Sequence, residues 1–372
     1  MRLSALLSLR LVLPTAAVLV SACAGAQPSG GSAAGPTATM AAPAEAPKLI
    51  VLIVVDQLRG EMLDRYRPSL SGGYLRLMNE GAWYSNAFQD HAITETAPGH
   101  ASVLSGRFPA STGIISNSAG VIDSRYPLVT GLSSEVGASP DRFQGTTLVD
   151  WLVARDARSR ALSVSAKDRA AILPVGRSKQ EVYWYSVNGS FTTSDYYRDS
   201  LPPWVVAFNG RRLPHRYAGA VWDLAKSPSA YPEPDSVVFE NRGSDFVFPH
   251  AFPADSDQAA SVIRITPTID SITALFALEG LERLALGRGP QTDVMSVSFS
   301  ATDYIGHQYG PDSREAHDNA IRLDQTLAWF LDSLFKVRDP STVMIALTGD
   351  HGVQPIPELA RERGLARKNE AQ

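Results

Sequence analysis

A polar turn at residues 94–100, with the sequence TETAPGH, offers a threonine hydroxyl that could act as a nucleophile. Pro98 suits the first turn of a helix, because its missing N–H would be unpaired there. We therefore expect Thr96 at or just before a helix N-terminus, where free backbone N–H groups and the positive end of the helix dipole gather. Such a hydroxyl could attack phosphorus and leave an anionic oxygen facing those donors. The alternative is that Thr94 or Thr96 only caps the helix.

Carboxylate and imidazole side chains follow three apolar runs of the chain. They are Asp56 after 48–55, Asp303 and His307 after 294–300, and Asp350 and His351 after 343–348. An Asp and a His four residues apart can reach one cation from a single helical turn. The adjacent Asp-His pair can do so if the backbone bends, and Gly349 and Gly352 allow that. Carboxylate and imidazole without thiolate suit zinc in a catalytic site. For Asp56 alone, the alternative is a turn-forming residue after a strand.

The elements that would position these groups alternate between strands and helices. The predicted strands are 48–55, 160–165, 294–300 and 343–348, and the predicted helices are 148–154, 272–286 and 315–337. The run 48–55 is apolar throughout, which is typical of a strand buried on both faces of a parallel sheet. The alternation predicts an α/β fold with a doubly wound, mostly parallel sheet flanked by helices. Ligands bind at the carboxyl ends of the strands in such sheets.

A Lys-Asp-Arg tripeptide follows the strand predicted at 160–165. Lys167 and Arg169 could neutralise the nonbridging oxygens of a phosphoryl group, where transition-state charge gathers. A phosphate monoester is a dianion and favours positive partners, whereas a diester carries one charge and a second bulky group. The two cations therefore favour monoesters. The alternative is a solvated turn.

The region 173–264 interrupts the alternation of strands and helices. It is rich in Pro and in aromatic residues, among them Trp184, Tyr185 and Phe191. We interpret it as a cap inserted over the carboxyl edge of the sheet. The alternative is a peripheral decoration that only packs against the rest of the chain.

Composition excludes some classes of partner. The 372 residues are 44% hydrophobic and 19% charged, as in globular proteins. The formal net charge of −4 gives no electrostatic reason to expect nucleic acid as a partner. Nothing after the N-terminal region resembles a membrane-spanning helix. We expect a monomer that acts on small molecules.

The N-terminus has the pattern of a bacterial export signal. Arg2 and Arg10 precede an apolar run, 11–20, which is too short for a comfortable membrane span. The run ends close to Cys23, in a sequence, VSAC, that resembles a lipobox. We expect a signal peptide over 1–23, lipidation of Cys23 and a flexible tether over 24–47, with the protein in the periplasm or anchored to the outer membrane. The alternative for this lone cysteine is a buried thiol.

Taken together, these motifs resemble the alkaline phosphatase superfamily. The residues that carry the resemblance are Asp56, Thr96, Asp303, His307, Asp350 and His351. They are most similar to the type I phosphodiesterase/nucleotide pyrophosphatase branch, and within it to the bacterial phosphate-irrepressible alkaline phosphatases. The resemblance covers about 49–357. It implies an alkaline phosphatase-like domain over 48–372, Thr96 as nucleophile, and Asn117, Lys167 and Arg169 as groups that bind the phosphate.

The resemblance also implies two zinc ions. The ligands of one would be Asp56, Thr96, Asp350 and His351. The other would be held by Asp303, His307 and a histidine well downstream of the Asp-His-Gly motif. No histidine follows His351 in this sequence, so we expect a truncated or alternatively ended member that lacks this ligand.

The activity implied by the resemblance is zinc-dependent hydrolysis of phosphate monoesters through a phosphothreonine intermediate. The alternatives are a phosphodiesterase or nucleotide pyrophosphatase, and a non-catalytic protein that binds phosphate or metal. Sulfatases of the superfamily need a Cys or Ser that becomes formylglycine, which a Thr cannot provide. Cofactor-independent phosphoglycerate mutases use Ser and lack this export signal.

Overall fold

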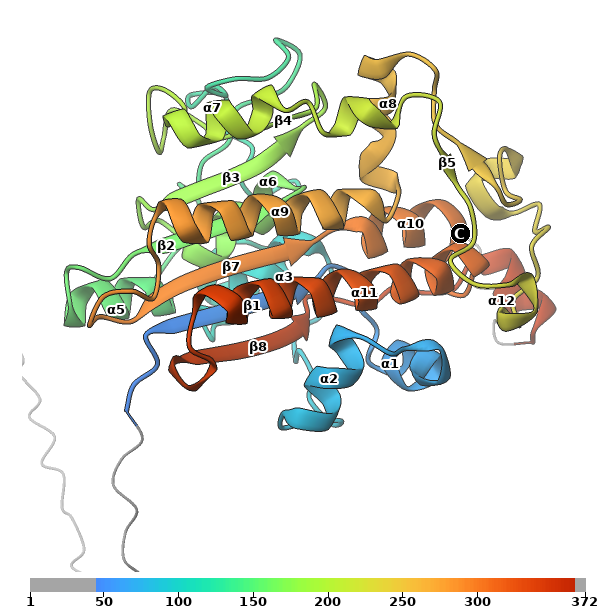
Figure 1. The fold of residues 1–372 in the computed structure, drawn as a ribbon, viewed down its shortest axis with the longest axis horizontal. Helices are drawn as coiled ribbons and strands as arrows, with labels where there is room; N and C mark the ends of the chain where they lie inside the picture. The colour runs from blue at the N-terminus through green and yellow to red at the C-terminus, as the bar shows by residue number, and fades with distance from the viewer. Residues whose placement is uncertain (1–44, 365–372) are drawn as a thin grey trace, which may run out of the picture. The chain divides into compact units, whose positions relative to one another are not determined.

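A six-stranded sheet between two layers of helices forms the centre of the computed structural model, which describes residues 45–364 (Figure 1). The strand order is β4-β3-β2-β7-β1-β8. Neighbouring strands are parallel except β3 and β4, which are antiparallel. The strands are β1 Leu49–Val55, β2 Ala161–Ser165, β3 Glu181–Ser186, β4 Ser190–Thr192, β7 Asp293–Phe299 and β8 Val343–Gly349.

The four predicted strands are confirmed as β1, β2, β7 and β8, and they are neighbours in the sheet. Val55 at the end of β1 pairs with Phe299 of β7 and with Gly349 of β8, so these three strands end level with one another. In a parallel sheet, the residues that follow level strand ends share one edge. The register therefore brings together the polar residues after β1, β7 and β8.

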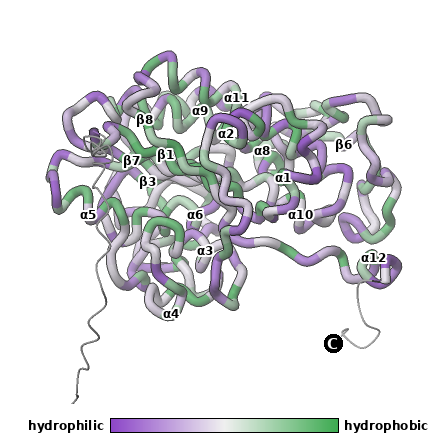
Figure 2. The backbone as a smooth tube through the Cα atoms, turned by 90° about the horizontal axis from the view of Figure 1, so that it is seen from below, coloured by the Kyte–Doolittle hydropathy of each residue, from purple (hydrophilic) through white to green (hydrophobic). Residues whose placement is uncertain are grey.

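Helices cover both faces of the sheet, which confirms the doubly wound arrangement (Figure 2). One face carries α9 (Thr268–Arg283) and α11 (Arg314–Val337), and the other carries α3 (Thr96–Val103), α5 (Leu148–Arg155) and α6 (Asp168–Ile172). Alternate residues of β1 serve different cores. Leu49, Val51, Ile53 and Val55 pack with residues of α9 and α11, whereas Ile50 packs with residues of α3, α5 and α6. Every residue of β1 is buried, as its apolar sequence requires.

The prediction of a cap over 173–264 is wrong for residues 181–192. Those residues form β3 and β4, which extend the main sheet, and Trp184, Tyr185 and Phe191 are buried in it. Aromatic residues favour strands because they pack well on a pleated surface. The later part of the range lies outside the main sheet and contains α7 (Pro203–Gly210), β5 (Val221–Trp222), β6 (His250–Ala251) and α8 (Ser256–Val262). Figure 1 shows β5 and α8 beyond the carboxyl ends of the strands.

The remaining α-helices are short, and the chain also contains several 3₁₀ turns. They are α1 Gly60–Tyr66, α2 Gly73–Glu80, α4 Pro109–Thr112, α10 Ala301–Tyr309 and α12 Pro357–Glu362. Within 45–364, no single helix is long and apolar enough to cross a bilayer. The stretches Ser256–Ile265 and Thr268–Arg283 meet that test only jointly, across a bend of 92°. The predicted signal peptide, Cys23 and the tether up to residue 44 lie outside the described residues.

Candidate active site

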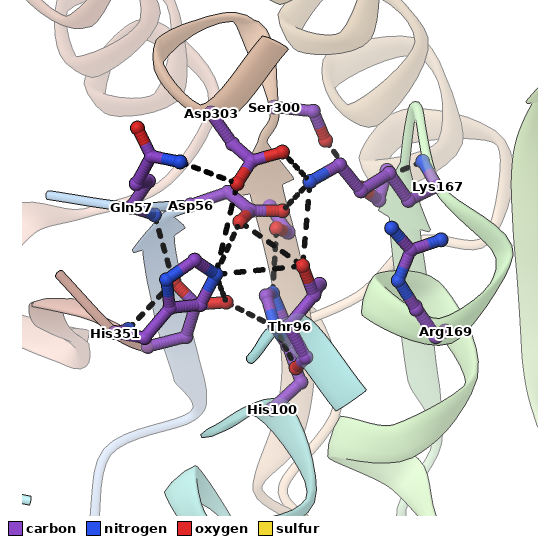
Figure 3. A network of polar contacts seen from close by, with 12 residues as sticks. Asp56, Gln57, Thr96, His100, Lys167, Arg169, Ser300, Asp303 and His351 are labelled. Carbon is purple, nitrogen blue, oxygen red and sulfur yellow. Dashed lines mark hydrogen bonds and ion pairs between the residues drawn. The ribbon is translucent and has the colours of Figure 1, made fainter. Parts of the chain in front are cut away.

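The ends of four neighbouring strands deliver the predicted site residues to one point at the edge of the sheet (Figure 3). Asp56 follows β1, Lys167 follows β2, Asp303 lies in the first turn of α10 after β7, and Asp350 and His351 follow β8. Thr96 reaches the same point from the first residue of α3. Side chains that are far apart in the sequence thus come within contact distance because the strands are parallel and adjacent.

The Thr96 hydroxyl faces this cluster and does not cap its helix. The helix begins at Thr96 as predicted, but its N-cap residue is Glu95 and no side chain makes a capping hydrogen bond. The Thr96 Oγ1 donates to Asp56 Oδ1 at 3.4 Å and lies 3.5 Å from His351 Nε2. It also accepts from Lys167 Nζ at 3.4 Å. The capping alternative for Thr96 is therefore wrong.

Three buried carboxylates lie beside Thr96, and each has a cationic or imidazole partner. Lys167 Nζ lies 2.7 Å from Asp56 Oδ2 and also contacts Asp303 Oδ2. Burial and the neighbouring Asp350 raise the pKa of Asp56, but Lys167 and His351 lower it by more, so the net pKa lies below the ordinary value. The pKa values of Asp303 and Asp350 are also lowered, despite burial. The three groups are therefore ionised carboxylates that attract cations.

His351 points its Nε2 atom at the same carboxylates. This atom lies 3.3 Å from Asp56 Oδ1, 3.7 Å from Asp303 Oδ1 and 3.6 Å from Asp350 Oδ2. Burial lowers the pKa of His351, but Asp56 and Asp350 raise it to about 9 overall. The other ring nitrogen, Nδ1, lies 2.8 Å from the Gly352 carbonyl oxygen, which can only accept. That contact fixes the ring with Nε2 facing the cluster, as in histidines that ligate metals.

These residues could hold a metal ion. The ligand atoms of Asp56, Asp303 and His351 lie within 4.8 Å of one another, and so do those of Asp56, His100 and Asp350. Lys167 already places one positive charge between Asp56 and Asp303. A donor set of carboxylates and imidazole, without thiolate, fits zinc. His307 contacts the cluster only through Asp303, with Nε2 3.1 Å from Oδ1, and its side chain is 65% exposed.

Asn117 contacts the helix that begins at Thr96, and Arg169 follows β2 close to Lys167. The Asn117 Oδ1 accepts from the Ala97 backbone N–H at 2.9 Å, and its Nδ2 donates to no atom of residues 45–364. Among residues 45–364, the Arg169 side chain forms a hydrogen bond only with Asp168, at 3.4 Å, and its buried Nε has no hydrogen-bond partner. Figure 3 shows its guanidinium group beside Lys167. Both side chains thus have donors without a hydrogen-bond partner among residues 45–364.

Two residues to which the sequence assigned no role lie within the cluster. One is Gln57. The other is His100, which is fully buried on α3, with Nδ1 2.9 Å from both Asp350 Oδ2 and the Thr96 carbonyl oxygen and Nε2 2.8 Å from Ser298 Oγ. His100 thereby holds Asp350 against the helix that carries Thr96. The sequence feature that could have identified His100 is its spacing, because it lies four residues after Thr96 on the same helix.

Comparisons with known proteins show the family of this chain. A family model described as type I phosphodiesterase / nucleotide pyrophosphatase matches residues 50–368. The chain is 36% identical to alkaline phosphatase PhoV of Synechococcus elongatus, over 85% of this chain and 61% of that protein. It is 34% identical to alkaline phosphatase PafA of Elizabethkingia meningoseptica, over 82% of this chain and 60% of that protein.

A solved structure shares the fold. The crystal structure of wild-type PafA matches with a TM-score of 0.79 at 31% identity, over 88% of this chain and 66% of that one. The chain therefore spans less than two thirds of the length of PhoV and PafA.

Proposed function

Because the chain belongs to the type I phosphodiesterase/nucleotide pyrophosphatase family, we propose that it is a zinc-dependent hydrolase of phosphate monoesters with Thr96 as its nucleophile. The observation that carries the proposal is the Thr96 hydroxyl, which contacts Asp56, His351 and Lys167 at the strand ends. The names of PhoV and PafA, both alkaline phosphatases, support hydrolysis of phosphate esters.

In this proposal, Asp56, Asp350 and His351 would hold one zinc ion together with Thr96, and Asp303 and His307 would contribute ligands to a second. Bound zinc would lower the pKa of the Thr96 hydroxyl and supply positive charge to the phosphoryl group. The Thr96 oxygen attacks phosphorus, and the bond to the leaving alcohol breaks. Water then attacks the phosphothreonine, which releases phosphate and restores the hydroxyl.

The phosphoryl oxygens would be bound by donors around Thr96. Thr96 is the first residue of α3, so its backbone N–H has no acceptor within the helix. This group, the Asn117 Nδ2 and the Arg169 guanidinium can donate to nonbridging oxygens, where charge develops in the transition state. Lys167 is engaged by Asp56 and Asp303, and zinc on those carboxylates would take over its role as their counter-charge. Its ammonium group could then face the extra negative charge of a monoester.

The proposal includes export. The apolar run at 11–20 and the lipobox-like sequence that ends at Cys23 support secretion and attachment to a membrane through a lipid anchor.

The test compares two substrates and two pairs of substitutions. The zinc-loaded protein should hydrolyse an aryl phosphate faster than a bis-aryl phosphate, and a chelator should stop the reaction. Replacing Lys167 and Arg169 together with Ala should lower monoester turnover by roughly 10²–10³-fold and diester turnover much less. Arg177 and Lys179 have the same spacing just before β3, at the opposite edge of the sheet. Replacing that pair with Ala should change neither rate.

Other results would overturn the proposal. Faster turnover of the diester would make the protein a phosphodiesterase. Equal losses on both substrates in the Lys167 and Arg169 variant would mean that the two cations support the fold. Zinc binding without turnover of either ester would indicate a binding protein.

A further inference from the structure

Gln57 has an unusual backbone conformation directly after the Asp56 ligand. Its φ angle is +69°, and its side chain is almost completely buried, with the residue 2% exposed. Residues other than glycine rarely adopt a positive φ, and a long side chain such as that of Gln is not among the types enriched there. The conformation turns the chain sharply at the end of β1. It directs both the backbone N–H and the side-chain amide of Gln57 towards the carboxylate cluster.

Two hydrogen bonds connect Gln57 to different parts of that cluster (Figure 3). Its backbone N–H donates to Asp350 Oδ1 at 2.9 Å. Its side-chain Nε2 donates to Asp303 Oδ1, also at 2.9 Å. Asp350 follows β8, whereas Asp303 lies on α10. One residue thus joins the carboxylate at a strand end to the carboxylate on the helix.

The sequence of α10 makes room for this side chain. Gly306 lies in the interior of α10, where glycine is unfavourable relative to other residues. A Cβ atom at this position would lie 1.9 Å from Gln57 Oε1. Packing therefore explains the glycine at this position, because the amide of Gln57 occupies the space where the Cβ atom of any other residue would lie. The helix and the amide are fitted to each other around Asp303.

We propose that Gln57 is a positioning residue that sets the orientation of the Asp303 carboxylate for metal binding. This inference rests on the proposed zinc-dependent function. Carboxylates that ligate metals are held by hydrogen bonds from neighbouring groups, and loss of such a partner costs about 10–100-fold in metal affinity. Asp303 receives this hydrogen bond from Gln57. Without the amide, the carboxylate keeps its charge and its contacts with Lys167 and His307, but Oδ1 loses one of the hydrogen bonds that hold it in place.

The test measures Zn²⁺ affinity by competition with a chromogenic chelator, and the thermal midpoint of the metal-free protein. Gln57→Gly removes the amide and tolerates the positive φ, while the backbone N–H to Asp350 remains. Gln57→Met keeps the length of the side chain without its donor. Both variants should bind Zn²⁺ about 10–100-fold more weakly than the wild type, with the metal-free midpoint nearly unchanged.

Ala285→Gly is a matched control, because Ala285 also has a positive φ, +50°, but lies near the opposite end of the sheet, before β7. This variant should bind Zn²⁺ like the wild type. The proposal is overturned if Gln57→Gly and Gln57→Met both keep wild-type affinity. It is also overturned if neither variant folds, because the amide would then be a folding element. A wild-type chain that binds no Zn²⁺ would refute the proposed function as well, so the two failures are distinguishable.

Discussion

His351 and His307 both lie beside an aspartate of the cluster, but their surroundings are opposite. The His351 side chain is 5% exposed, and its Nε2 faces three carboxylates at the ends of β1, β8 and α10. The His307 side chain is 65% exposed and contacts only Asp303, on its own helix, among residues 45–364. The level strand ends therefore preorganise one part of the site, the buried half, which comprises His351 and the three carboxylates that it faces. The other part, the exposed half, is His307 on α10, whose side chain is open to solvent.

Lys167 tests how strongly the buried half needs a positive charge. Lys167→Met should destabilise the metal-free protein by about 3–5 kcal/mol, because Asp56 and Asp303 would remain buried without their partner. Zn²⁺ should recover most of this loss by replacing the ammonium charge. Chemical denaturation with and without Zn²⁺ measures both effects. Arg169→Met is the control and should change stability less, since the only ion pair of Arg169 among residues 45–364 is with its neighbour Asp168. Equal stability of the two metal-free variants would contradict the described ion pairs.

Matched substitutions of the two histidines test the comparison itself. His351→Gln should weaken Zn²⁺ binding by more than roughly 100-fold, beyond the effect of losing a supporting hydrogen bond. His307→Gln should weaken it less than His351→Gln does, because the exposed His307 ring is held by one polar contact only among residues 45–364. Titration of each variant with Zn²⁺ in the presence of a competing chelator gives both values. Similar losses in the two variants would show that the exposed half is as organised as the buried one.

His100 tests whether α3 helps to organise the buried half. His100→Phe removes the contacts to Asp350 and Ser298 and should weaken Zn²⁺ binding by about 10–100-fold. His317 is also buried, but it contacts Glu233 and Ser69, away from the strand ends. His317→Phe should therefore lower the thermal midpoint without changing Zn²⁺ affinity. If both variants lose affinity equally, His100 acts through general packing.

Much of the fold could be predicted because its central strands have a clear pattern. Runs such as 48–55 are buried on both faces, and this burial leaves a continuous apolar sequence. β3, although longer than β2, was missed because it lies in a region with many prolines, and β4 has only three residues. Their position depends on pairing with β2 and with each other, which a local pattern does not contain.

The site was predictable where a residue directly follows a strand. Asp56 and Asp350 were found in this way. Asn117 came only from family resemblance, because no local pattern links its loop to α3. His100 was assigned no role from the sequence, because its role depends on how closely α3 approaches Asp350. A Cβ atom on Gly99 would lie 2.4 Å from the Asp350 carbonyl oxygen, so that approach is a property of the tertiary structure.

The most direct test of the proposed function is detection of phosphate on Thr96. The zinc-loaded protein is mixed briefly with an aryl phosphate and quenched in acid, and its peptides are analysed by mass spectrometry. We expect phosphate on Thr96 in the wild type and at the same position in Thr96→Ser. In Thr96→Ala we expect no phosphate, no turnover and a nearly unchanged thermal midpoint. Normal turnover by Thr96→Ala, or phosphate on another residue during turnover, would contradict the assignment of Thr96 as nucleophile.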